Sequence, residues 1–135
     1  VTYADPRTTA GSHYWYQVKA VNGGGSSAYS TPPTTVTLPP APATPTLLTA
    51  TAVRSGGTDR VTLTWTNNAP DATGFTIERS TTAAFTTVTT STAGATATTL
   101  TQTGVPRNTT FYYRIKALNL GGASGWSNVA SVLTP

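Results

Sequence analysis

The sequence predicts an all-β protein folded as an antiparallel sandwich, and three observations support this prediction. Apolar and polar residues alternate in 61–65, 75–78 and 111–117. Such alternation places one face of a strand in a core and the other in solvent. Clusters of Gly, Pro and Asn separate these runs, and Thr accounts for 32 of 135 residues. Short strands divided by turns are typical of a sandwich, and a high Thr content favours strands over helices.

The composition excludes most catalytic and metal chemistry. The chain contains no Cys, one His and four carboxylates, which are Asp5, Asp59, Asp71 and Glu78. A Cys/His zinc site lacks its ligands, and no acid–base constellation stands out. The sequence therefore predicts a protein that is not an enzyme and that holds no cofactor or metal.

The charge pattern and the absence of long apolar runs exclude two further classes of partner. The net charge of +4 arises from 8 basic and 4 acidic residues, and the basic residues are scattered along the chain. Nucleic-acid binders instead concentrate positive charge on one face. No apolar run approaches the ~20 residues that a membrane helix needs. We therefore expect no nucleic-acid binding and no membrane insertion, and the charge-poor, Thr-rich composition indicates an extracellular or cell-surface protein.

An internal repeat organises the chain. When the sequence is shifted by 97 positions, residues 1–38 align with 98–135 without a gap, and 8 of the 17 positions from 14 to 30 are identical. The chain therefore contains two copies of one unit, and the first copy is incomplete.

The second copy carries motifs of a known family. They are Val61-Thr62-Leu63-Thr64-Trp65, Gly74-Phe75-Thr76-Ile77-Glu78-Arg79, Phe111-x-Tyr113-Arg114-Ile115-x-Ala117-x-Asn119 and Gly121-Gly122-x-Ser124-x-Trp126-Ser127. With these motifs, residues 41–135 resemble a fibronectin type III domain. The resemblance implies an immunoglobulin-like β-sandwich, with strands A, B and E packed on strands C, C′, F and G, in tandem modules.

The resemblance divides the chain into three units. Residues 1–38 resemble strands E, F and G of a preceding module, with Tyr3 in strand E, and residues 46–135 resemble a complete module. Between them, residues 39–45 contain four prolines, which favour an extended, semi-rigid spacer of about 20 Å. Because the first unit lacks the strands that would cover its core face, we expect it to be ordered only with strands from a longer chain or another subunit.

The inward positions of the alternating runs predict the core of the complete module. They are Leu63, Trp65, Phe75, Ile77, Phe111, Tyr113 and Ile115. The family usually begins strand F with a Tyr whose hydroxyl bonds to the E–F corner. Tyr14 fits this pattern, but the complete copy has Phe111, which forfeits a bond worth roughly 0.5–1.5 kcal/mol. Pro106 is expected to stiffen that corner instead.

Five residues are candidates for stacking or surface binding. They are Trp126, Arg114, Tyr112, Trp15 and Tyr29, placed by the resemblance on the outward face of strand F or at the start of strand G. Trp126 resembles half of the Trp-Ser-x-Trp-Ser element of cytokine-receptor modules, in which the ring stacks on Arg side chains. We expect the Trp126 ring to stack on Arg114 rather than to bind sugar.

The remaining polar candidates have structural interpretations. We expect His13 to be a solvated loop residue, Asp71 to cap backbone amides in a turn, and Glu78 to form a cross-strand ion pair with Arg114. The segment Asn108-Thr109-Thr110 is an N-glycosylation acceptor sequence, which matters only in a source that glycosylates.

The favoured function is a non-enzymatic spacer or adhesive segment of a larger secreted or surface protein built from tandem modules. Its expected partners are other modules of the same chain or neighbouring subunits. One alternative is a filament subunit whose partial first module is completed by another chain. Another is a glycan-binding accessory module of a secreted hydrolase, with glycans as its partners.

Overall fold

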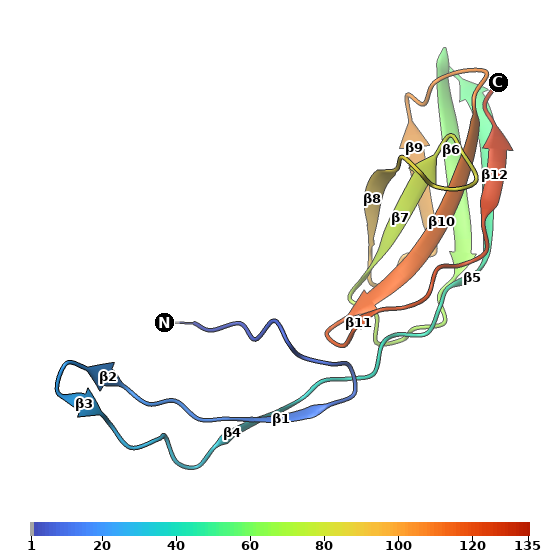
Figure 1. The fold of residues 1–135 in the computed structure, drawn as a ribbon. Helices are drawn as coiled ribbons and strands as arrows, with labels where there is room; N and C mark the ends of the chain where they lie inside the picture. Colours follow the sequence, from blue (N-terminus) through green and yellow to red (C-terminus); the bar gives the residue numbers. More distant parts are fainter. Residues whose placement is uncertain (1) are drawn as a thin grey trace.

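The computed structural model describes residues 2–135, and all regular structure in that range is β. Figure 1 shows a sandwich, formed by residues 46–135, and a long hairpin that extends away from it, which we call the arm (residues 2–38). Residues 39–45, which we call the linker, join the two parts. The prediction of an all-β antiparallel fold is confirmed.

The first sheet of the sandwich has the order β5-β6-β9. Its strands are β5 (Thr46–Ser55), β6 (Thr58–Thr66) and β9 (Thr99–Thr103). The register of β5 shifts between Thr46 and Thr49, where Leu47 adopts a φ of 55°. The Asn128 carboxamide holds the next residue, because it accepts from Leu48 N at 3.0 Å and donates to Leu48 O at 2.9 Å. This side chain ties β5 to the opposite sheet.

The second sheet has the order β8-β7-β10, with two short strands paired to β10. Its members are β7 (Gly74–Ser80), β8 (Thr89–Gly94), β10 (Thr110–Asn119), β11 (Gly122–Ala123) and β12 (Ala130–Leu133). The register of β7 on β10 places Glu78 opposite Arg114. Their ion pair is present, with Arg114 Nη2 at 2.7 Å from Glu78 Oε2.

The core lies between these two sheets. All seven predicted core residues are buried, with exposed fractions of 5% or less. They are Leu63, Trp65, Phe75, Ile77, Phe111, Tyr113 and Ile115. Trp65 packs edge-on against Phe75, with ring centroids 5.5 Å apart, an arrangement that aromatic pairs prefer.

Tyr113 makes the free energy of unfolding depend on pH in the alkaline range. Burial raises the pKa of Tyr113 above its ordinary value of 10.0, and Arg79 opposes part of this effect. The folded protein therefore retains the phenol proton at a pH where the unfolded chain has lost it, and this favours unfolding as pH rises. The contribution is complete below the unfolded pKa of about 10 and is lost as pH rises through the folded pKa.

We therefore expect the free energy of unfolding to fall between about pH 9 and pH 11, and to fall less in Tyr113→Phe. Urea unfolding at the two pH values measures both slopes. Tyr112→Phe is the matched control, because Tyr112 lies half-buried on the outer side of the same strand. An equal decline in Tyr113→Phe and the unsubstituted protein would contradict the prediction.

The arm contains two short ladders. They pair β1 (His13–Tyr16) with β4 (Thr34–Thr37), and β2 (Val21–Asn22) with β3 (Gly25–Ser26). The strand expected around Tyr3 is not formed, and the Tyr3 side chain is 82% exposed. Such a strand would pair with a neighbour from the first sheet, and the described part of the arm provides no such neighbour.

The segment from 39 to 45 has no regular hydrogen-bonded structure, but it is not a free spacer. Pro42 and Pro45 are buried against the sandwich. The Asn68 carboxamide donates to Thr44 O at 2.9 Å. Half of the expected spacer therefore belongs to the packed surface of the sandwich, because apolar proline rings are stabilised by leaving water.

Candidate functional site

The outer face of the second sheet carries a stack of cations and aromatic rings. The Arg114 guanidinium lies 4.2 Å from the centroid of Phe85 and 4.3 Å from that of Trp126. Lys116 Nζ lies 4.6 Å from the Trp126 centroid. Glu78 accepts hydrogen bonds from the same guanidinium. Glu78 thus pairs with Arg114, and Trp126 already contacts two cations, an arrangement that suits a structural role.

The five candidate surface residues do not form one platform. Tyr112, Arg114 and Trp126 belong to the sandwich, whereas Trp15 and Tyr29 lie on the arm. Trp15 is 67% exposed, and its edge meets the His13 ring with centroids 4.3 Å apart. Lys19 Nζ lies 5.3 Å from the Tyr29 centroid. Neither Tyr29 nor Trp126 begins a strand, since both lie between shorter strands than expected.

Two polar predictions need correction. His13 lies in β1 rather than in a loop, and its Nδ1 forms a hydrogen bond with Thr37 Oγ1 across the ladder. Among the described residues, Asp71 caps no backbone amide. Its Oδ2 accepts from Asn119 Nδ2 at 2.7 Å, and Asn67 Oδ1 accepts from Ala69 N in that turn.

The corner before strand β10 differs from the equivalent corner of the arm. In the arm, the Tyr14 hydroxyl accepts a hydrogen bond from Thr9 N at 2.7 Å, and hydrogen bonds from Thr9 lower the pKa of Tyr14. The repeat aligns Thr9 with Pro106 and Tyr14 with Phe111. Because proline has no N–H, the sandwich has lost the donor and the acceptor together.

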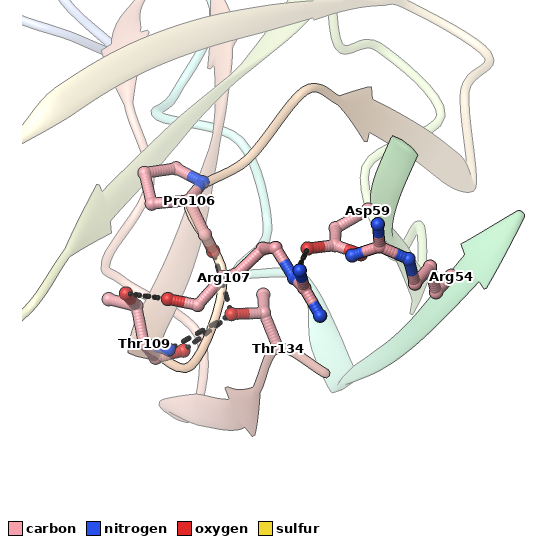
Figure 2. Close-up of polar contacts among 6 residues, drawn as sticks. All are labelled: Arg54, Asp59, Pro106, Arg107, Thr109 and Thr134. Atoms are coloured by element: carbon pink, nitrogen blue, oxygen red, sulfur yellow. Dashed lines mark hydrogen bonds and ion pairs between the residues drawn. The ribbon is translucent and has the colours of Figure 1, made fainter. Parts of the chain in front are cut away.

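Thr134 closes that corner in the sandwich (Figure 2). Its Oγ1 lies 2.7 Å from Pro106 O and 3.1 Å from Thr109 O, and it accepts from Thr109 N at 3.0 Å. A single hydroxyl has one proton, so it donates to one of the two carbonyls at a time. A buried threonine hydroxyl thus holds this corner, where the family usually has a tyrosine hydroxyl.

The same end of the sandwich contains a buried carboxylate. Asp59 has a side chain that is 1% exposed, and it lies between Arg54 at 3.4 Å and Arg107 at 3.6 Å (Figure 2). Asn108 lies in the adjoining corner, exposed and with a φ of 48°. The acceptor sequence for glycosylation is thus accessible, at the end of the sandwich opposite the arm (Figure 1).

The joint between the arm and the sandwich is held from both sides. Gly11 N in the arm donates to Pro39 O at 3.0 Å. The Asn119 carboxamide in the sandwich donates to Pro40 O at 2.9 Å. A Cβ on Gly121 would lie 2.0 Å from Pro39 O, so only glycine permits this approach.

The two hairpins on either side of the linker have the same pattern of hydrogen bonds to serine hydroxyls. In the arm, Ala20 N and Val18 N donate to the hydroxyls of Ser27 and Ser30 at 2.9 and 3.1 Å. In the sandwich, the aligned Ala117 N and Ile115 N donate to Ser124 and Ser127 at 2.9 and 3.1 Å. The arm therefore keeps the local geometry of the complete unit.

The arm leaves an apolar hollow of about 480 Å³ beside β1 and β4. Its apolar lining is formed mainly by Tyr3, Tyr16, Val18 and Val36. Burial, together with a hydrogen bond to Asp5, raises the pKa of Tyr16.

Within residues 2–135, no three His, Cys, Asp or Glu side chains are grouped to hold a metal ion. No helix in that range is long and apolar enough to cross a membrane.

A family model, that of the fibronectin type III domain, matches residues 43–133. The chain belongs to the fibronectin type III family. It is similar to an Fn3-like protein from Clostridium thermocellum at 38% identity and a TM-score of 0.57, over 70% of this chain and 95% of that one. No curated protein sequence matches the chain.

Two other similar structures show the fold alone, because their identities are low. The FN1–FN3 domains of chicken CNTN1 are 18% identical with a TM-score of 0.70, over 98% of this chain and 46% of that one. A β-1,2-glucanase from Parabacteroides distasonis is 20% identical with a TM-score of 0.57, over 70% of this chain and 13% of that one. The Fn3 fold thus occurs in larger proteins of different kinds.

Sequence reasoning missed several contacts of this Fn3 module. Phe85 stacks on Arg114 from a Thr-rich segment without alternation, so no pattern marked it. The repeat shows that the corner lacks an N–H at Pro106. Nothing in the sequence places Thr134 beside that corner, so its contact with Pro106 O could not be predicted.

Proposed function

We propose that the chain is a non-enzymatic spacer segment of a larger extracellular protein built from tandem Fn3 modules. The main support is the joint, in which Pro39 O and Pro40 O accept hydrogen bonds from opposite sides. Prolines restrict the backbone of this segment, and two anchors reduce its freedom further. Successive modules are then held in one relative orientation, as a spacer requires.

A distance measurement between spin labels tests this function. The chain has no Cys, so Thr35→Cys and Thr103→Cys provide unique labels at exposed strand positions on the arm and the sandwich. We expect one narrow distance distribution. The double variant Pro39→Gly/Pro40→Gly is expected to broaden it, because glycine restores backbone freedom.

Pro33→Gly is the matched control, since Pro33 is exposed in the arm and outside the joint. The control is expected to keep the narrow distribution. A broad distribution in the protein with its native linker would overturn the spacer proposal.

A filament subunit remains the second candidate, and the apolar face of the arm favours it. Val18 is 72% exposed and Val36 is 43% exposed, whereas Ile115, the residue aligned with Val18, is fully buried. Strands of another chain would bury this face by completing the sandwich. Concentration-dependent assembly in sedimentation, abolished by Val18→Asp, would support the filament. A monomer at all concentrations would exclude it.

The glycan-binding alternative has less support. Trp126 is already stacked with two cations, and the most exposed rings lie on the incomplete arm. Glycan-binding surfaces need rings that are free and held in place.

A further inference from the structure

In the sandwich, the turn between β10 and β11 is a preformed binding site for the linker. Asn119 Oδ1 accepts from Gly121 N at 2.8 Å, which orients the carboxamide. Its Nδ2 then donates to Pro40 O at 2.9 Å and to Asp71 Oδ2 at 2.7 Å. The missing Cβ of Gly121 leaves room for Pro39 O. The turn thus binds a segment through its backbone carbonyls.

The arm repeats this turn in the same conformation. The repeat aligns Asn22 with Asn119 and Gly24 with Gly121. Asn22 Oδ1 accepts from Gly24 N at 2.8 Å, the same bond as in the sandwich. Gly25 and Gly122, which follow, have φ values of 130° and 127°. The chain therefore contains two copies of the same turn geometry.

The copy in the arm has no segment bound to it within the described residues. A Cβ on Gly24 would meet only Asn22 Oδ1, at 3.4 Å, where the aligned Gly121 meets two proline carbonyls. A hollow of about 460 Å³ lies at this turn, lined by residues from Ala20 to Ser27. The orientation of Asn22 leaves its Nδ2 to donate to a carbonyl placed there.

We infer that the turn Asn22–Gly25 is a binding site for a proline-rich extended segment that presents consecutive backbone carbonyls. Such a segment has free carbonyls and little conformational entropy to lose. Asn22 binds one carbonyl, and the absence of a side chain at Gly24 lets the neighbouring carbonyl approach. This inference rests on the proposed tandem arrangement, because the occupant leads into the first strand of the module that contains the turn.

An extended chain tests the site. Residues 39–97 of this chain, placed before Val1, restore the register of the repeat and supply a linker and the missing strands. In that protein, Gly24→Ala is expected to lower the thermal midpoint of the completed module by about 4 °C or more. In the chain of 135 residues, Gly24→Ala is expected to change nothing, because its Cβ meets no linker. Equal effects in both proteins would overturn the inference.

If the completed module fails to fold, as judged by rapid amide exchange from Trp15 to Val21, a second measurement tests the inference. In the chain of 135 residues, Gly121→Ala is expected to broaden the distance between labels at 35 and 103, and Gly24→Ala is not. If Gly121→Ala leaves a narrow distribution unchanged, the turn does not hold linkers and the inference fails while the spacer proposal stands. A broad distribution before any substitution at the turn would instead reject the spacer proposal.

Discussion

Replacing Trp65 by alanine is expected to lower the free energy of unfolding by about 3–5 kcal/mol. The ring is 5% exposed and lies in the core, edge-on to Phe75. Its removal loses the transfer free energy of the ring and leaves a cavity between the two packed sheets. Urea unfolding, followed by circular dichroism, measures the loss.

Trp65→Phe is the control for this prediction. The smaller ring keeps most of the apolar contact, and it removes an indole Nε1 that is buried without a hydrogen-bond partner in the described structure. An unpaired buried donor is costly, so its loss offsets part of the cost of the smaller ring. We expect Trp65→Phe to cost much less than Trp65→Ala. A denaturation midpoint unchanged by the alanine variant would refute the assignment of Trp65 to the core.

The double variant Arg54→Ala/Arg107→Ala is expected to cost about 3 kcal/mol, because it leaves a buried carboxylate without a counter-ion. Asp59 is 1% exposed on its side chain, and each arginine approaches a different carboxylate oxygen. Either single variant retains one partner and is expected to cost about 1 kcal/mol or less, since the arginines are partly exposed. The double variant should therefore cost more than the two single variants added together.

Arg60→Ala is the matched control. Arg60 follows Asp59 in β6, is exposed, and forms no ion pair in the part of the chain that the structure describes. Its replacement is expected to leave the denaturation midpoint unchanged. Additive effects of the two arginine substitutions would show that Asp59 does not depend on them jointly.

The core could be predicted from the sequence because alternation encodes it locally. In β6, Val61, Leu63 and Trp65 point to one side for a geometric reason that needs no knowledge of the partner sheet. The same applies to β10, where Phe111 and Tyr113 are buried. Burial follows from period 2 wherever only one face of a strand is solvated.

The polar contacts could not be predicted in this way, because they depend on side chains that lie far apart in the sequence. Asn119 binds Pro40 across 79 positions, and Thr134 binds Pro106 across 28. No local period links such residues. The predicted strand near Tyr3 failed for a related reason, since strand formation there needs a partner that alternation does not reveal.

The shared serine network of the two hairpins has a consequence for how the chain folds. Ser124 lies 7 positions from its partner Ala117, and Ser127 lies 12 positions from Ile115. Closing such short loops costs little entropy, and hairpins form within microseconds. Contacts between β5 and β12 join opposite ends of the segment that forms the sandwich, and they form more slowly. The hairpin of β10 and its neighbours is therefore expected to form early and to serve as the template on which the remaining strands assemble.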